Sequence, residues 1–344
     1  MSEVLKQKVV DEFDETTIEQ GVDGFLAAAT AAEVLAGLAQ SPKKIAPKYF
    51  YDKKGSALFD AITRVDDYYV PRVEQQIFEQ FRSEMCAAMG AGVTLIEPGA
   101  GSCEKVKWLL QELQPKIYMP MDISAEHLEE SAAGLKSLYP DLRIIPQVGD
   151  HTIDINIELD EPTEQAVFFY PGSSIGNFDP AAAECFLRTM RTMRKQQQTE
   201  VPNASAAGGL LIGVDAKKDP AFLNAAYNDR EGLTAKFNLN VLDHLNELLE
   251  GNIPVENFAH HAFYNENDGR IEMHLRCIKS HTATLAGQHL EFTDGELVHT
   301  EYSYKYHPDE FIDLAKRAGF AMKALWQDPQ KWYSVIYFEP SSSA

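Results

Sequence analysis

The residues best suited to chemistry begin at a glycine turn. The run Leu95-Ile96-Glu97-Pro98-Gly99-Ala100-Gly101 has the pattern of a strand that ends in a tight turn and leads into a helix. Glycines let the backbone pass close to a ligand, and the free N–H groups at the start of a helix can bind an anion. Glu104 stands where a dinucleotide motif has its third glycine, so the GxGxxG pattern is incomplete.

Acidic residues also follow the next two expected strands. Asp122 closes the second strand, where its carboxylate can accept hydrogen bonds from both hydroxyls of a ribose. Gly149-Asp150 follows the third strand, where the carboxylate can accept from an adenine amino group. The carboxyl ends of such strands line the crevice where open α/β sheets bind ligands. An acidic residue before GxG is typical of S-adenosylmethionine methyltransferases, so the pattern favours that cofactor over a dinucleotide.

Short apolar runs alternate with helical patterns around these residues. The expected strands are Val93–Glu97, Ile117–Asp122, Leu142–Pro146, Ala166–Tyr170 and Gly209–Asp215. The expected helices are Glu104–Leu113, Ala125–Leu138, Ala181–Arg194 and Pro308–Ala318, and two closing strands are expected at Met322–Trp326 and Trp332–Glu339. Strands that alternate with helices indicate a parallel sheet covered on both faces. The predicted fold class is α/β, with a Rossmann-like, seven-stranded methyltransferase domain.

A second unit interrupts this alternation after Asp215. The sequence predicts a helix over Ala221–Leu249 and antiparallel strands at Phe258–Tyr264, Arg270–Ile278, Ala283–Phe292 and Leu297–Tyr306. Helical spacing also predicts a helix over Val22–Leu38. We expect a cofactor-binding methyltransferase domain at 73–214 and 306–344, an inserted α+β substrate-recognition domain at 20–72 and 215–305, and a flexible arm at 1–19.

Composition and charge narrow the classes of partner. The chain carries 31 basic and 52 acidic side chains, a formal charge of −21 that disfavours nucleic acid as a partner. No apolar run approaches the roughly 18–20 residues needed to cross a bilayer, and the first residues lack a signal-peptide pattern. The four cysteines form no CxxC pair, so neither a zinc site nor a disulfide framework is expected. We therefore expect a cytoplasmic monomer without a metal site or a membrane partner.

Several longer stretches resemble one enzyme family over nearly the whole chain. They are Pro47-Lys48-Tyr49-Phe50-Tyr51-Asp52, Gly55-Ser56-Ala57-Leu58-Phe59-Asp60, Ile62-Thr63-Arg64, Gly172-Ser173-Ser174-Ile175-Gly176-Asn177, Ala226-Tyr227-Asn228-Asp229, Phe237-Asn238-Leu239-Asn240-Val241-Leu242 and Arg270-Ile271-Glu272-Met273. In this order they resemble the histidine Nα-methyltransferases of ergothioneine biosynthesis, which form hercynine, the trimethyl betaine of histidine. The resemblance implies an S-adenosylmethionine-dependent enzyme whose small-molecule substrate is L-histidine.

The resemblance also implies roles for individual residues. Those that match the family's S-adenosylmethionine site are Gly99, Lys105, Asp122, Asp150 and His151. Those that match the site of the substrate carboxylate are Asn177 and Tyr227, with Gly172 nearby. Those that match the wall around the amino group are Tyr51, Phe59 and Tyr68, and those that match the imidazole site are Met273, Glu301 and Ser303. Tyr51 and Asn177 are the candidate catalytic residues. Pro98 and His151 depart from the family pattern, which puts cofactor affinity in question more than function.

Strand geometry agrees with the expected imidazole site. Glu301 and Ser303 lie two residues apart on an expected strand, so both side chains project from the same face. A carboxylate and a hydroxyl side by side can bind the two nitrogens of one imidazole. Burial under aromatic rings would favour the neutral amine that methyl transfer needs, because desolvation penalises the ammonium form. No residue stands out as an obligatory base.

Three alternatives remain open from the sequence. A related enzyme could methylate another amino acid such as tryptophan, although it would need an apolar residue in place of Glu301. A nicotinamide-dependent oxidoreductase is disfavoured by Glu104 in the glycine turn. A binding module without activity would bind the cofactor and release no methylated product.

Overall fold

An eight-stranded sheet organises the larger part of the molecule. The computed structural model describes residues 15–150, 165–198 and 209–341, with the side chains of 15–26 and 193–198 left out. The strand order of the eight-stranded sheet is β13-β14-β7-β6-β2-β3-β4, with β5 also paired to β3. The strands are β2 (Thr94–Pro98), β3 (Ile117–Asp122), β4 (Arg143–Ile144), β5 (Gln147–Val148), β6 (Ala166–Tyr170), β7 (Gly209–Asp215), β13 (Phe320–Gln327) and β14 (Tyr333–Pro340). Strands β7, β6, β2 and β3 are parallel to one another. Next to them, β14 is antiparallel to both of its neighbours, β7 and β13.

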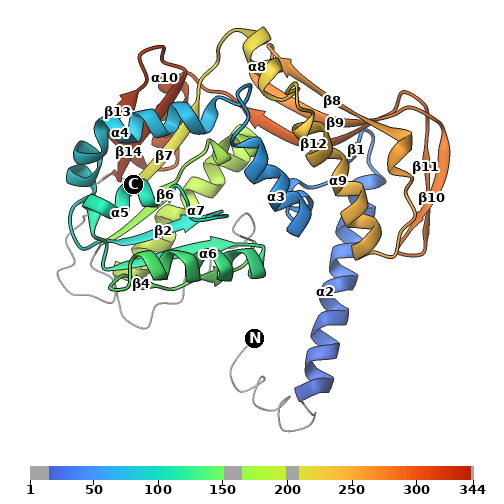
Figure 1. Ribbon diagram of the computed structural model, residues 1–344, viewed down its shortest axis with the longest axis horizontal. Helices are drawn as coiled ribbons and strands as arrows, with labels where there is room; N and C mark the ends of the chain where they lie inside the picture. The colour runs from blue at the N-terminus through green and yellow to red at the C-terminus, as the bar shows by residue number, and fades with distance from the viewer. Residues whose placement is uncertain (1–14, 151–164, 199–208, 342–344) are drawn as a thin grey trace.

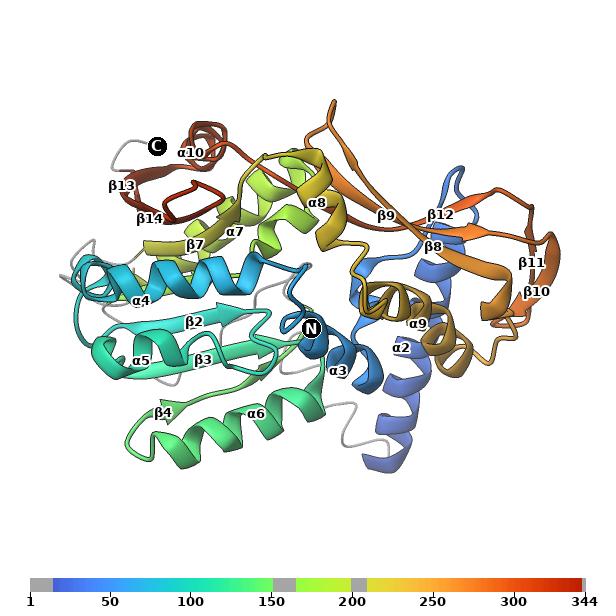
Figure 2. The same cartoon turned by 45° about the horizontal axis from the view of Figure 1, so that its top comes forward.

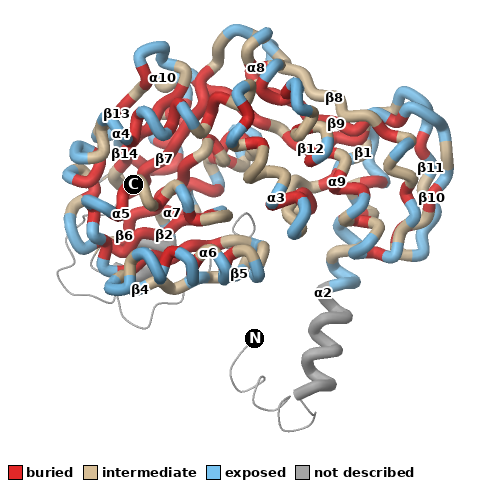
Figure 3. The backbone as a smooth tube through the Cα atoms, viewed as in Figure 1, coloured by how far each residue is buried: buried red, intermediate tan, exposed pale blue. Residues whose placement is uncertain are grey.

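Helices cover both faces of this sheet (Figure 1). They are α4 (Val70–Met89), α5 (Lys107–Leu113), α6 (Ala125–Leu138), α7 (Pro180–Gln198) and α10 (Pro308–Arg317). Successive side chains of a strand point to opposite faces, so Leu95 joins the apolar cluster of α4, α5 and α6, and Ile96 joins that of α7 and α10. Figure 3 shows buried residues concentrated along these strands, as expected for a sheet covered on both sides.

The second sheet is smaller and stands beside the first (Figures 1 and 2). Its order is β1-β12-β9-β8, and a separate hairpin pairs β10 with β11. The strands are β1 (Lys43–Lys44), β8 (Phe258–Asn265), β9 (Arg270–Cys277), β10 (His281–Leu285), β11 (Gln288–Phe292) and β12 (Leu297–Tyr304). The accompanying helices are α2 (Glu15–Leu38), η1 (Pro47–Phe50), α3 (Lys53–Ile62), η2 (Ser174–Asn177), α8 (Pro220–Ala226), α9 (Leu233–Leu248) and η3 (Val255–Asn257).

The prediction of one continuous helix over Ala221–Leu249 is wrong, and the difference bears on the site. It is two helices, α8 and α9, separated by residues 227–232. Gly232 has φ +67°, a left-handed conformation that no α-helix contains, and the Asp229 carboxylate caps α9 by accepting from Leu233 N (2.8 Å) and Thr234 N (2.7 Å). The break gives Tyr227 a position at a helix end.

Four further boundaries differ from expectation. Of the strand predicted at Leu142–Pro146, only Arg143–Ile144 is strand (β4), and a second short strand, β5, follows at Gln147–Val148, because Pro146 has no N–H for the ladder. The run Ala283–Phe292 is the hairpin β10–β11, whose turn has positive φ at Ala286 and Gly287. Helix α5 begins at Lys107 rather than Glu104, since residues 104–106 form tighter turns in which Lys107 N donates to Glu104 O and Trp108 N donates to Lys105 O. Helix α2 begins at Glu15, within the predicted arm 1–19.

The predicted domain borders cut through two observed elements. Helix α4 begins at Val70, before the border at 72/73, and β7 ends at Asp215, after the border at 214/215. Among the described residues, no helix is both long enough and apolar enough to cross a membrane.

Three histidines, two of them buried, occupy the face of the second sheet opposite Met273. Cross-strand pairing places His261 beside His274 and His274 beside His299, with ring centroids 6.3 and 5.4 Å apart. Within the described part of the chain, His274 Nδ1 and His299 Nε2 are buried without a hydrogen bond. Burial, with smaller contributions from His274 and Lys44, lowers the pKa of His299 to about 4. The folded protein therefore holds this ring neutral.

Protonation of His299 should destabilise the fold in mild acid. The pKa rises to about 6.5 on unfolding, so the penalty is absent above that pH and grows as the pH falls toward about 4. We expect the free energy of unfolding to fall by about 2 kcal/mol more between pH 8 and pH 5 in the wild type than in His299→Gln. Urea unfolding at both pH values measures this difference. His289→Gln, at an exposed position, is the matched control, and equal pH dependence in all three proteins would contradict the prediction.

Candidate active site between the two sheets

Two cavities meet beside the carboxyl ends of the parallel strands. The larger has a volume of about 1460 Å³ and is lined by Gly99, Gly101 and Asp122 among others. The smaller, of about 620 Å³, is lined by strand residues of the small sheet and by the turn and η2 that follow β6 of the large sheet. Both cavities share four lining residues, which are Tyr51, Phe59, Ser174 and Asn177. A group bound in one cavity can therefore be presented to a group bound in the other.

The glycine turn forms one wall of the larger cavity. Gly99 and Gly101 have φ +69° and +50°, and a Cβ on Gly101 would project into open space with no atom within 4 Å. Asp122 Oδ2 accepts from Gly101 N at 2.9 Å, and its Oδ1 accepts from Ser124 N at 3.0 Å. A carboxylate offers about four lone-pair positions, so both oxygens keep capacity for ligand hydroxyls. Ile123, an unusually exposed isoleucine, adds an apolar surface.

A segment of the N-terminal part of the chain closes the far side of this cavity. Lys48 in η1 lies 2.8 Å from Glu33 in α2 and 3.3 Å from Asp150, and all three line the cavity. Asp150, the residue predicted to contact adenine, thus lines the larger cavity and forms an ion pair with Lys48. His151 lies outside the described residues. The predicted cofactor contact of Asp150 stays a prediction.

Lys105 lines neither cavity. Its Nζ is 2.7 Å from Oε2 of Glu74, a carboxylate in α4 with no solvent exposure. The other oxygen of Glu74 accepts from Gly172 N and from the Tyr333 hydroxyl, both at 2.7 Å. Gly172 has φ +79°, and a Cβ there would meet Lys105 Nζ at 2.5 Å. Lys105 and Glu74 thus fix the turn after β6, and the predicted contact of Lys105 with the cofactor stays a prediction.

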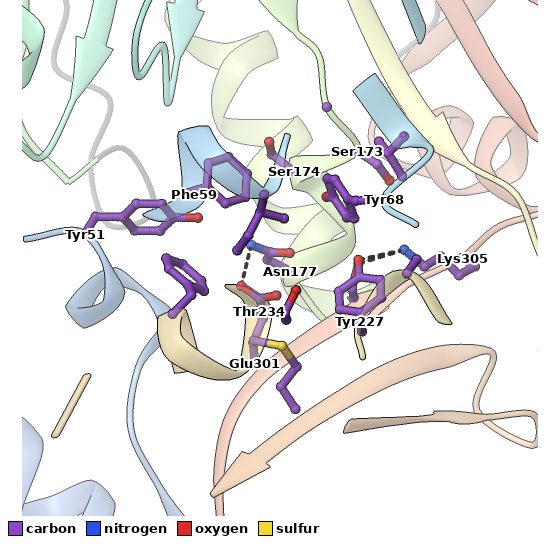
Figure 4. A pocket seen from close by; sticks show the side chains of 17 residues that line it. Tyr51, Phe59, Tyr68, Ser173, Ser174, Asn177, Tyr227, Thr234, Glu301 and Lys305 are labelled. Carbon is purple, nitrogen blue, oxygen red and sulfur yellow. Dashed lines mark hydrogen bonds between the residues drawn. The ribbon is translucent and has the colours of Figure 1, made fainter. Parts of the chain in front are cut away.

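Aromatic side chains form one end of the smaller cavity (Figure 4). The rings of Tyr51 and Phe59 lie edge to face with centroids 5.9 Å apart, and Phe237 from α9 lies 5.8 Å from each. Tyr68 lines the same cavity nearer to Tyr227, edge-on to that ring with centroids 6.0 Å apart, and its predicted place around the amino group stays a prediction. Phe237 belongs to one of the stretches that resemble the family, but the sequence alone gives this third ring no role.

Hydroxyl groups and a lysine form the opposite end. The Tyr227 hydroxyl donates to Ser303 Oγ at 2.9 Å, and Lys305 Nζ donates to Ser303 Oγ at 2.9 Å and to the Tyr227 oxygen at 3.1 Å. Lys305 is only 1% exposed. Sequence reasoning missed it, although strand alternation extends the shared face of Glu301 and Ser303 to residue 305.

Glu301 lies between the two ends of the cavity. Its Oε2 accepts from Asn177 Nδ2 at 3.4 Å, and cross-strand pairing places Met273 beside it. The close approach of η2 to β12 needs a glycine at position 176, because a Cβ on Gly176 would lie 2.7 Å from the backbone carbonyl oxygen of Tyr304. Burial raises the pKa of Glu301 to about 7, although the nearby Lys305 opposes this shift.

The structure thus assembles most of the predicted site. The predicted residues that line the smaller cavity are Tyr51, Phe59, Tyr68, Gly172, Asn177, Tyr227, Met273, Glu301 and Ser303. Those that line the larger cavity are Gly99, Asp122 and Asp150.

The sheet order, the glycine turn and the acidic strand ends define a Rossmann-like methyltransferase that uses S-adenosylmethionine. The model of a family described as S-adenosylmethionine-dependent, histidine-specific methyltransferases matches residues 30–340. The chain belongs to this family.

Relatives of known name agree. The chain is 37% identical over 316 residues to a histidine N-alpha-methyltransferase of Mycolicibacterium smegmatis, covering 89% of this chain and 94% of that protein. It is 34% identical over 302 residues to the protein of the same name from Mycobacterium tuberculosis, covering 86% and 90%. An L-tryptophan methyltransferase of Psilocybe serbica is more distant, at 24% identity over 345 residues, covering 89% and 91%.

Asp122 should contribute strongly to cofactor affinity. Hydrogen bonds to a charged group contribute about 1.5–3 kcal/mol, so Asp122→Asn should weaken binding of S-adenosylhomocysteine by about 10- to 100-fold. Isothermal titration calorimetry measures the change. Asp179→Asn is the control, because Asp179 also accepts two backbone N–H groups, at 3.0 and 2.9 Å, and lines neither cavity. An equal loss in both variants would show that Asp122 acts only on the backbone.

Proposed function

We propose that this protein transfers methyl groups from S-adenosylmethionine to the α-amino group of L-histidine and forms hercynine. The observation that carries the proposal is the inner wall of the smaller cavity, where Glu301 and Ser303 lie on one strand face and Glu301 accepts a hydrogen bond from Asn177 (Figure 4). Fungal relatives are named ergothioneine biosynthesis protein 1, and one from Neurospora crassa is 30% identical over 303 residues. Hercynine formation would place this chain at the first step of ergothioneine biosynthesis.

The larger cavity fits the adenosyl half of the cofactor. Asp122 offers acceptors for ribose hydroxyls, Gly99 and Gly101 allow close approach, and Ile123 offers an apolar wall for the base. When bound, S-adenosylmethionine supplies a methyl group already activated by a sulfonium. The four residues shared by the two cavities then mark where the amine must stand.

The aromatic end of the smaller cavity favours a neutral amine. The rings of Tyr51, Phe59 and Phe237 surround this end of the cavity, and desolvation by such apolar surroundings penalises an ammonium group. Burial, followed by the charge of Glu301, holds the pKa of Tyr51 well above its usual range. Its hydroxyl therefore stays protonated and serves as a neutral hydrogen-bond partner rather than as a base. The same rings can stabilise the quaternary product by cation–π contact.

The opposite end supplies polar groups for the carboxylate and the side chain of the substrate. Asn177 Nδ2 stands at the junction of the cavities, and the cluster of Tyr227, Ser303 and Lys305 stands beyond it. We propose Asn177 and Tyr227 as the carboxylate contacts and Met273, Glu301 and Ser303 as the imidazole contacts.

Four expectations beyond the reaction stay predictions. They are the division into a cofactor unit (73–214 and 306–344) and a substrate unit (20–72 and 215–305), the monomeric state, the cytoplasmic location, and the lack of nucleic-acid and membrane partners.

Substrate selectivity tests the proposal. An indole ring has one N–H and no acceptor nitrogen, so it cannot bond to both Glu301 and Ser303, and histamine has no carboxylate for Asn177. We expect kcat/KM for histidine to exceed that for tryptophan and for histamine by at least about 100-fold. Mass spectrometry of each amine, incubated with purified protein and S-adenosylmethionine, measures this ratio. Preferred turnover of tryptophan would identify a different amino-acid methyltransferase, and no methylated product from any amine would indicate a binding module.

The protonation of Glu301 should appear in the pH profile. Its pKa of about 7 means that the carboxylate, which accepts from an imidazole N–H, is lost as the pH falls through that value. We expect kcat/KM for histidine to fall below about pH 7 in the wild type. The side chain of Glu301→Gln cannot titrate, so this variant should have a lower kcat/KM whose pH dependence reflects only the ionisation of the substrate. A wild-type profile with the same acid limb as Glu301→Gln would remove Glu301 from the imidazole site.

A further inference from the structure

The smaller cavity has a single basic side chain among the described residues that line it. That side chain is Lys305, and the one acidic side chain in the same lining is Glu301. Lys105 lies close to Gly172 but does not line the cavity, and the buried carboxylate of Glu74 pairs with it at 2.7 Å. A negatively charged group of a ligand bound beside Glu301 therefore has Lys305 as its nearby cation.

Lys305 acts on the cavity through hydroxyl groups. Its Nζ donates to the Tyr227 oxygen at 3.1 Å and to Ser303 Oγ at 2.9 Å, and it lies 2.8 Å from Asp215 Oδ2. An ammonium has three donors and no acceptor, so Lys305 is the donor in all three contacts. These contacts use its whole hydrogen-bonding capacity, and its charge reaches a ligand by way of Tyr227 and Ser303.

The Tyr227 hydroxyl is a strengthened donor as a result. Burial, followed by the charge of Glu301, holds the pKa of Tyr227 above its usual range, so the hydroxyl keeps its proton. A cation that donates to the phenol oxygen polarises the O–H group and favours its donation to an anion. The Ser303 hydroxyl, 2.9 Å away, can donate to the Tyr227 oxygen in turn, which leaves the Tyr227 proton for a ligand.

Asp215 does not cancel the charge of Lys305 at the cavity. Its carboxylate is shared by two ammonium groups, since Lys218 pairs with its other oxygen, and Asp215 itself does not line the cavity. The remaining effect is visible at Glu301, where burial raises the pKa and Lys305 opposes that shift. The positive charge of Lys305 thus acts across the space that the ligand would occupy.

We propose that Lys305 is a positioning residue that makes a negatively charged carboxylate, rather than a neutral group of the same shape, the preferred partner of Tyr227 in this cavity. The substrate carboxylate accepts from the Tyr227 hydroxyl while Lys305 donates to the same oxygen, so one hydroxyl group separates the two charges. Without Lys305, the carboxylate and Glu301 would be two like charges in a desolvated cavity. The inference rests on the proposed function, from which it takes histidine and the carboxylate contact of Tyr227.

The charge of the ligand tests this role in the wild type alone. Histidinamide has the size of histidine and keeps a carbonyl acceptor, but its amide is neutral. With S-adenosylhomocysteine present, the wild type should bind histidine at least about 10-fold more tightly than histidinamide, because hydrogen bonds to charged groups are stronger by about this factor. Isothermal titration calorimetry at one pH measures both affinities. Equal affinities would overturn the inference without any variant.

The decisive variant is Lys305→Met, which removes the positive charge and keeps an unbranched side chain. Its preference for histidine over histidinamide should be about 10-fold smaller than that of the wild type, mainly through weaker binding of histidine. A lysine that only supported the fold would weaken both ligands equally when replaced. An unchanged preference in folded Lys305→Met would therefore overturn the inference. The ionisation of each ligand cancels, because each is compared between proteins at the same pH.

Lys218→Met is the matched control. Lys218 also pairs with Asp215, but it lines neither cavity and, in the described part of the chain, has no hydrogen bond to Tyr227 or Ser303. This variant should keep the wild-type preference, and an equal loss in Lys218→Met and Lys305→Met would contradict a particular role of Lys305.

A second variant guards against misfolding of Lys305→Met. Adding Asp215→Asn to it removes both members of the buried pair, so the Asp215 charge is not left behind without Lys305, and the same loss of preference is expected. Failure of the wild type to bind or methylate histidine would instead overturn the proposed function. Normal methylation of histidine together with equally tight binding of histidinamide would overturn the inference alone.

Discussion

A buried ion pair joins the two sheets at the point where the substrate cavity forms. Asp215 ends β7 of the large sheet, Lys305 follows β12 of the small sheet, and both are almost completely excluded from solvent. Desolvating two charges is costly, and loss of one partner of such a pair typically destabilises a protein by about 3–5 kcal/mol. Here each charge is surrounded by hydrogen bonds, so the pair holds Ser303 and Tyr227 in place and fixes how the sheets meet.

A second constraint is the close approach of backbone to backbone around this pair. Gly176 lets η2 touch β12, which brings Asn177 to Glu301, and Gly172 leaves room for Lys105 on the buried carboxylate of Glu74. Asn177 consequently lines both cavities. Methyl transfer needs an acceptor held in line with a donor at roughly 3–3.5 Å, a requirement that flexible loops meet poorly. The turns after β6 are instead fixed by buried hydrogen bonds.

Burial also sets the chemistry of the cavity. The pKa of Glu301 is raised toward neutrality, and the pKa of Tyr51 is raised out of the physiological range. One end of the cavity thus presents neutral aromatic groups to an amine, and the other end presents a carboxylate and hydroxyl groups. This contrast along a single cavity suits an amino acid whose two ends differ in polarity, and it gives a physical reason why histidine and tryptophan would be distinguished.

The sequence by itself determined the succession of strands and helices along the chain, since glycine turns, apolar strands and helical periods are local signals. The order of those strands within the sheet came from the tertiary structure. The sequence also determined that Asp122 lies at a strand end and that Glu301 and Ser303 share a strand face. Both features depend only on neighbouring residues, because side chains alternate between the two faces of a strand. Only the tertiary structure decided that α8 and α9 separate at Tyr227, that Tyr68 packs edge-on to Tyr227, and that Phe237 completes the aromatic end. It alone joined Lys105 to Glu74 and Lys305 to Asp215, because both contacts link residues far apart in the chain, and the second also depends on how the two sheets pack.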